Sequence, residues 1–305
     1  MKRSINLFAI SALAGSLAAC GGSGGGSSSA QTGTVSVGLT DAPATDLSSV
    51  HIAFNTIRLK HADGEWLEYS LEETGNVDLL TLQGGMTEPL ITDEEVPAGE
   101  YKEIRLIVDT DNSWVTKTSE GDARYTLGVP SGEQSGLKLK GDFVVAADTS
   151  TDFTIDFDVR KSIVDPQGSA QGDFMLKPVL RLVNNLEVGK ITGEVNYATI
   201  NQSTSCSTNY EGSVYVYEGL GVEPVDLNVN REGTNPLMIV PVADEDTDSL
   251  HEWTAAFLTE GAYTVSYSCQ VDDNETDDAM NFYGTQNVEV RAGETTEAAL
   301  IPQQS

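Results

Sequence analysis

Two acidic clusters contain the side chains of this chain best suited to holding a metal ion. They are Asp244, Asp246 and Asp248 in the first cluster, and Asp272, Asn274 and Asp277 in the second. Calcium takes six to eight oxygen ligands, which closely spaced Asp and Asn side chains can supply. We therefore expect calcium as an optional ligand, and no cofactor is required by the pattern. The alternative is that both clusters are acidic loop tips that only face solvent.

Residues for nucleophilic catalysis are scarce. The histidines are His51, His61 and His251, and no G-x-S-x-G motif is present. A zinc-protease helix would need a second histidine four residues after His251, where the chain has Ala255. We do not expect an enzyme. The alternative is a hydrolase that cleaves an envelope or extracellular polymer through paired carboxylates.

The balance of charge limits the partners. The chain has 17 Lys and Arg against 47 Asp and Glu, which gives a net charge of −30. Such a field repels phosphate backbones and excludes nucleic acid as an expected partner. A protein or a glycan remains as the expected ligand, although Trp66, Trp114 and Trp253 fit packing better than a sugar-binding face.

The N-terminus has the three parts of an export signal. Lys2 and Arg3 precede a mostly apolar stretch over residues 5–17, which is shorter than the 20 or so residues of a membrane-spanning helix. Small residues then lead into Cys20. The Leu-Ala-Ala-Cys sequence resembles the lipobox of bacterial lipoproteins, which implies cleavage before Cys20 and lipid attachment to its sulfur.

The residues after the lipobox predict a location. Gly21 follows the cysteine, where that family has Asp in proteins retained at the inner membrane, so we expect a lipid anchor in the outer membrane. Residues 20–34 then form a Gly- and Ser-rich linker. Whether the protein faces the periplasm or the exterior remains open. In an oxidising compartment, the remaining pair Cys206 and Cys269 predicts a disulfide.

Short alternating apolar runs predict an all-β fold. Val35, Val37 and Leu39 share one face of a strand, and the phase of the next run slips near Asn55 and Thr56, which predicts a bulge or a break in the strand. Only residues 78–82 have a helical pattern. We expect two β-sandwich domains, Ig-like or transthyretin-like, over residues 35–186 and 187–305, after the signal peptide of residues 1–19.

Five segments of the first domain resemble a known family. They are GTVSVGLTDAPA, VPAGEYKEIRLIV, PSGEQSGLKL, DFDVRKSIV and FMLKPVLR, and in this order they are similar to domain-of-unknown-function family 4382 over residues 33–183. This resemblance implies export, a lipid anchor and a β-sandwich, and it supplies no catalytic residues. GKITGEV, GAYTVSY and VEVRAGETTEAAL more loosely resemble transthyretin-like or carboxypeptidase-regulatory-like domains.

Together, these observations predict a membrane-anchored lipoprotein of the cell envelope that acts as a non-catalytic binding or structural module.

Overall fold

The computed structural model describes residues 31–42, 47–71, 75–121, 123–164, 172–200, 205–208, 210–244 and 250–302. Cys20 and the predicted signal peptide therefore lie outside the described residues. Within the described residues no helix combines the length and apolar composition needed to cross a membrane. The elements of the N-terminal half are β1 (Thr32–Ala42), β2 (Leu47–His61), β3 (Trp66–Ser70), β4 (Asn76–Asp78), η1 (Leu79–Thr81), β5 (Glu88–Pro97), β6 (Gly99–Lys117), β7 (Arg124–Gly128), β8 (Leu137–Val145), β9 (Ser150–Asp158), α1 (Val159–Ser162), β10 (Ile163–Val164), β11 (Phe174–Leu176) and β12 (Leu180–Asn184). Those of the C-terminal half are β13 (Val188–Val195), α2 (Tyr197–Ile200), β14 (Ser213–Glu218), β15 (Met238–Pro241), β16 (His251–Thr259), β17 (Gly261–Ser268), β18 (Tyr283–Val290) and β19 (Thr295–Glu297).

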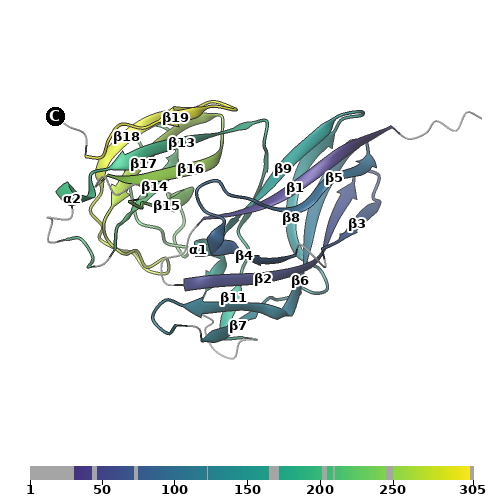
Figure 1. The fold of residues 1–305 in the computed structure, drawn as a ribbon, viewed down its shortest axis with the longest axis horizontal. Coiled ribbons are helices and arrows are strands. Elements are labelled where there is room, and N and C mark those ends of the chain that lie inside the picture. The colour runs from purple at the N-terminus through teal and green to yellow at the C-terminus, as the bar shows by residue number, and fades with distance from the viewer. Residues whose placement is uncertain are drawn as a thin grey trace, which may run out of the picture. The chain divides into compact units, whose positions relative to one another are not determined.

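The N-terminal half contains two sheets that share one hydrophobic core (Figure 1). The first has the order β12-β9-β1-β5, and β1 pairs in parallel with β9 and antiparallel to β5. The second has the order β10-β11-β7-β6-β2-β3, with β4 added to β2 and β8 added to β6. Val35, Val37 and Leu39 of β1 are fully buried in this core, as the alternating pattern predicts.

The predicted bulge is present in β2. Its pairing with β6 shifts register between Phe54 and Thr56, so that Phe54 and then Ile57 both face the core. The extra residue changes the phase of the side chains without ending the strand. The slip in the apolar pattern therefore marks a bulge and not a break.

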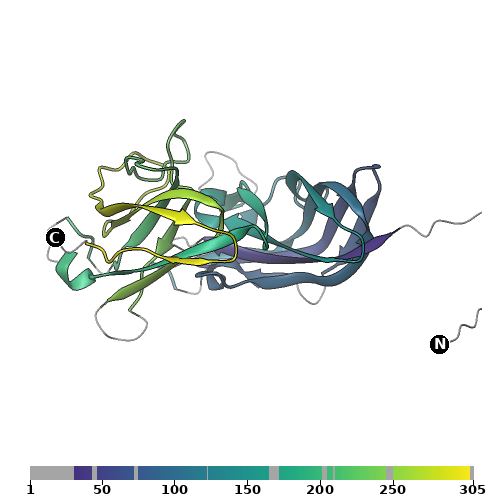
Figure 2. The same cartoon turned by 90° about the horizontal axis from the view of Figure 1, so that it is seen from above.

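The C-terminal half contains a three-stranded sheet, β16-β13-β19, and a four-stranded sheet, β15-β14-β17-β18 (Figure 2). Ile191, Val216 and Val265 are fully buried between them. Among the described residues, each strand pairs only with strands of its own half. The predicted all-β class is confirmed.

The helices are single turns. Residues 79–81 form the 3₁₀ turn η1, whose N-cap Asp78 accepts a hydrogen bond from the Leu80 amide, and this confirms the predicted helical turn. Val159 follows β9 directly and begins α1. The reason is Asp158, whose side chain caps the turn by accepting from the Lys161 amide.

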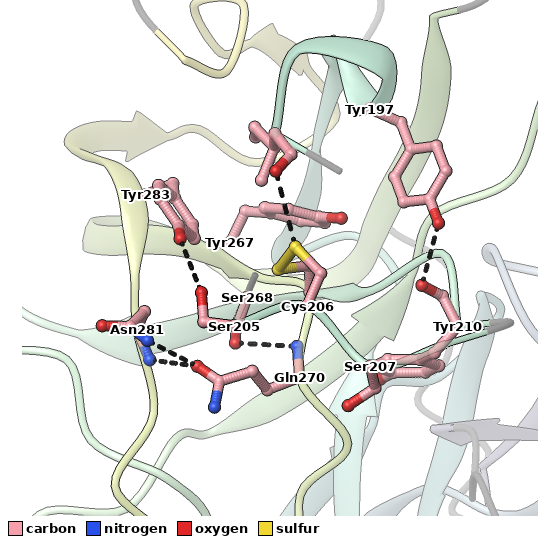
Figure 3. The surroundings of a disulfide bond; sticks show 12 residues. Tyr197, Ser205, Cys206, Ser207, Tyr210, Tyr267, Ser268, Gln270, Asn281 and Tyr283 are labelled. Carbon is pink, nitrogen blue, oxygen red and sulfur yellow. Dashed lines mark hydrogen bonds between the residues drawn. A yellow bond between two sulfur atoms is a disulfide. The ribbon is translucent and has the colours of Figure 1, made fainter. Parts of the chain in front are cut away.

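The predicted disulfide is confirmed. Cys206 and Cys269 are bonded at 2.03 Å and join the segment before β14 to the residue that follows β17 (Figure 3). The Ser207 amide also donates to the Cys269 carbonyl at 2.9 Å. The hydroxyls of Ser205 and Tyr283 lie 3.3 Å apart beside the bond (Figure 3).

Candidate functional site at the junction of the two halves

The turn α1 fastens the N-terminal half to the C-terminal half. The Lys161 ammonium group contacts the Asp158 carboxylate at 2.8 Å within its own turn. It also donates to the carbonyls of Pro236 and Leu237, at 2.9 and 2.8 Å, in the C-terminal half. The cap at Asp158 thus fixes the turn. The turn in turn places the Lys161 ammonium group at backbone carbonyls more than 70 residues away in the sequence.

Arg160 makes the second connection. Its side chain is buried, and its guanidinium lies 3.9 Å from the carboxylate of Asp272, which is fully buried. The side-chain amide of Asn274 donates to the Arg160 carbonyl. The loop of residues 272–278 therefore holds both the main chain and the side chain of Arg160.

Three carboxylates meet at this loop. Asp226, Asp272 and Asp278 each offer an oxygen, and these oxygens lie within 4.8 Å of one another. Asp272 accepts from the Tyr215 hydroxyl at 2.8 Å and from the Leu227 amide at 3.1 Å. Burial raises the pKa of Asp272 above its ordinary value, although these hydrogen bonds oppose the shift.

Arg231 borders the three carboxylates. It forms ion pairs with Asp226 and with Asp277, and it donates to the Asp226 carbonyl at 3.0 Å. The hydrogen bond from Arg231 holds the pKa of Asp277 below its ordinary value. Asp277 is thus an ion-pair partner at the exposed edge of the cluster.

A cleft of about 670 Å³ lies beside α1 and is lined by residues of both halves. Its apolar side chains are Val164 and Val179 from the N-terminal half, and Leu227 and Val229 from the C-terminal half. Its polar side chains are Lys161, Lys177, Asn230, Asn235 and Glu275. Ligand sites are commonly clefts of this volume at such junctions, with apolar walls and a few polar groups.

A second cleft, of about 740 Å³, lies on the N-terminal half beside β6 and β7. Trp114, one of its two aromatic residues, stacks on His51 with ring centroids 4.7 Å apart, and the Arg124 guanidinium lies 3.9 Å from the centre of the same ring. Burial lowers the pKa of His51. Because the Trp114 ring already has these contacts, it is a poor platform for stacking on a sugar.

Comparison with known proteins finds a family match within the N-terminal half. Residues 32–178 match the model of DUF4382, a domain of unknown function. The DUF4382 segment includes α1, and therefore Arg160, Lys161 and Lys177 of the junction. The acidic cluster belongs to residues that follow this segment.

Comparison with solved structures and with curated proteins does not indicate a function for this chain. A leucine-rich repeat protein from Bacteroides thetaiotaomicron is 13% identical, with a TM-score of 0.24 over 90% of this chain. This chain spans about a quarter of that protein, or 26%. BcpA, the major pilin subunit of Bacillus cereus, is 10% identical, with a TM-score of 0.16 over 88% of this chain and 98% of its own. The search of curated proteins finds no match.

The structure describes four of the six sequence-predicted calcium ligands. Asp244 is exposed, while Asp246 and Asp248 lie outside the described residues. Of the second cluster, Asp272 joins Asp226 and Asp278, whereas Asn274 contacts Arg160 and Asp277 contacts Arg231. Asp226 was missed because it lies 46 residues before Asp272 and no local pattern connects them.

The junction residues of the DUF4382 segment were also missed. Arg160 and Lys161 stand in DFDVRKSIV, one of the segments that carries the family resemblance. Two adjacent basic residues after a buried strand indicate a contact site only weakly, since nothing in the sequence indicates which residues they contact. His251, by contrast, is a buried strand residue 3.5 Å from Glu211, and Trp253 is buried in the core.

Proposed function

We propose that this protein is a lipid-anchored, non-catalytic binding module of the bacterial cell envelope, and that its ligand binds in the cleft beside α1. The anchor rests on the lipobox-like sequence before Cys20. The binding role rests on one observation, a cleft of about 670 Å³ with walls from both halves of the chain.

The lining of the cleft favours a peptide segment of a partner protein over a glycan. Four apolar side chains, those of Val164, Val179, Leu227 and Val229, can take up an apolar side chain of the peptide. The exposed ammonium of Lys177 has no ion pair within the described part of the chain and can accept a carboxylate. Asn230 and Asn235 offer amide groups for the peptide backbone. The proposed ligand is therefore an extended peptide with apolar and acidic residues.

Peptide selection tests this role. The full chain, purified in mild detergent, is used to select from a random 12-residue peptide library, and the affinities of the recovered peptides are measured by fluorescence polarisation. We expect Val229→Trp, which fills the cleft, and Lys177→Glu, which reverses its free charge, each to weaken binding at least tenfold. Val144→Trp is the matched control, because Val144 is 62% exposed and does not line the cleft. Peptides that bind all three variants as they bind the wild type would refute the cleft as the binding site.

A further inference from the structure

The three carboxylates at the junction have the geometry of a site for one cation. Asp226 precedes the segment of residues 227–235, whereas Asp272 and Asp278 stand at the two ends of one loop. Their oxygens lie within 4.8 Å of one another. Calcium binds oxygen at 2.3–2.6 Å, so two ligands of one ion lie at most about 5 Å apart. The cluster fits within this limit without rearrangement.

A second observation within the cluster calls for a ligand. The Asp272 side chain is fully buried, and its Oδ1 has no hydrogen-bond partner. The other oxygen, Oδ2, is the one that Tyr215, Leu227 and Arg160 approach. A buried carboxylate oxygen without a partner is costly, and native proteins supply a donor, a water or a metal.

The charges at this place favour a divalent cation. Four carboxylates, those of Asp226, Asp272, Asp277 and Asp278, surround two guanidinium groups, those of Arg160 and Arg231. The ionised carboxylates outnumber the guanidinium groups by two, so this group of side chains has a net charge of −2. Arg231 shares its single positive charge between the buried Asp226 and the exposed Asp277, and Arg160 is 3.9 Å from Asp272, beyond hydrogen-bonding distance. The cluster as a whole therefore keeps a net negative charge.

The chemistry of the donors selects calcium among the common divalent ions. All three side chains offer oxygen only, whereas zinc prefers nitrogen and sulfur ligands. Magnesium requires a near-ideal octahedron, and calcium tolerates irregular arrangements completed by water. Asp278 is only half-buried, so water can reach the ion from that side.

We propose that Asp226, Asp272 and Asp278 bind one calcium ion, which locks the loop of residues 272–278 against the segment that begins at Asp226. Because Asp272 and Asn274 of this loop contact Arg160, the ion also stabilises the junction between the halves. The site is independent of the proposed peptide-binding function, and its test contains no peptide.

Calorimetry and thermal unfolding of the full chain in detergent test the proposal. The added salts are CaCl2, MgCl2 and NaCl at equal ionic strength, so that general screening is matched. We expect one calcium per chain and a rise in Tm of about 5 °C in millimolar calcium, as for a ligand at about 100 times its Kd. Magnesium should give a clearly smaller rise, and NaCl should give none beyond screening.

Two variants and a control locate the ion. Asp278→Asn keeps the shape of a half-buried side chain and should weaken calcium binding at least tenfold. Asp244→Asn removes the same charge from an exposed position of the other acidic segment and should leave binding unchanged. Asp272→Asn removes the most buried of the three ligands and should abolish the calcium response.

Terbium provides a second readout. The Tyr215 hydroxyl lies 2.8 Å from the Asp272 carboxylate, so Tyr215 can sensitise the emission of terbium bound at Asp272. We expect sensitised emission that calcium displaces and that Asp278→Asn removes. The proposal is overturned if the wild type shows no stoichiometric calcium binding, or if Asp278→Asn and Asp244→Asn respond to calcium as the wild type does.

Discussion

The guanidinium of Arg160 lies 3.9 Å from the carboxylate of Asp272, and these two buried side chains come from different halves of the chain. Neither charge can be solvated by bulk water, so each depends on its surroundings in the junction. Arg160 belongs to the DUF4382 segment, whereas Asp272 follows it. The pair is therefore the most sensitive point at which to test whether the halves stabilise each other.

Replacement of Arg160 should destabilise the protein. Arg160→Met leaves the buried Asp272 without its cationic neighbour, and removal of one member of a buried pair costs about 3 kcal/mol. Urea unfolding in calcium-free buffer measures the loss. In the Asp272→Asn background the same replacement should cost much less, since no buried carboxylate remains to be compensated. Equal costs in both backgrounds would show that the two side chains do not interact.

Loss of the disulfide should weaken the C-terminal half. The bond spans 63 residues, and the chain-entropy model gives about 4 kcal/mol for a loop of this length. We expect the double variant Cys206→Ala and Cys269→Ala to lower the midpoint of urea unfolding by a corresponding amount. The same midpoint should be reached by the wild type in reducing agent. A wild-type midpoint unaffected by reducing agent would contradict the prediction.

The ion pair of Arg181 and Asp156 should give a pH-dependent effect. Burial raises the pKa of Asp156 above its ordinary value of 3.8, and Arg181, 2.7 Å away, limits the shift. A raised pKa means that stability is lost as the pH rises and the buried acid ionises. Arg181→Met should raise the pKa of Asp156 further, so it should cost about 3 kcal/mol at pH 7.5 and less at pH 5. Urea unfolding at the two pH values measures this difference, which should vanish in the Asp156→Asn background.

Two tyrosines should have equivalent roles in the two halves. The Tyr101 hydroxyl donates to the Pro97 carbonyl, and the Tyr263 hydroxyl donates to the Thr259 carbonyl, each at 2.8 Å and four residues upstream. We expect Tyr101→Phe and Tyr263→Phe each to cost about 1 kcal/mol in urea unfolding. Tyr125→Phe is the control, because that hydroxyl donates to the exposed side chain of Glu120. No loss in either core variant would show that these hydrogen bonds do not stabilise the turns.

The lipid anchor is tested by fractionation of cells. Cys20→Ala removes the only atom to which the predicted lipid could be attached at this position, so the protein should leave the membrane fraction. The wild type, expressed at the same level, should remain there. A Cys20→Ala variant that still sediments with membranes would refute the anchor.

The strands and the disulfide were accessible from sequence because both depend on simple rules. Alternation placed Val35, Val37 and Leu39 on one face, and the change of phase after Phe54 located the bulge. An even pair of cysteines in a chain that we expect to be exported predicted the bond between Cys206 and Cys269. Each of these patterns is visible within a short window or in a count of residues.

The junction was not accessible, because its parts come from three distant segments. The fold brings α1 against the loops of the C-terminal half, and only this contact places Arg160, Asp226 and Asp272 near one another. In sequence, Asp272 and Asp277 look alike as members of one acidic run. The fold buries the first and leaves the second exposed beside Arg231, and this difference decides which of them can serve as a buried ligand.

Hydrogen exchange of the full chain with a selected peptide is the most direct test of the binding role. Backbone amides exchange more slowly where a ligand excludes water and suppresses local opening. We predict slower exchange at residues 177–179 and 227–235, two segments that contain cleft-lining residues of the two halves, and no change at β8. Protection confined to one half, or centred on the second cleft around Trp114, would contradict the proposed site.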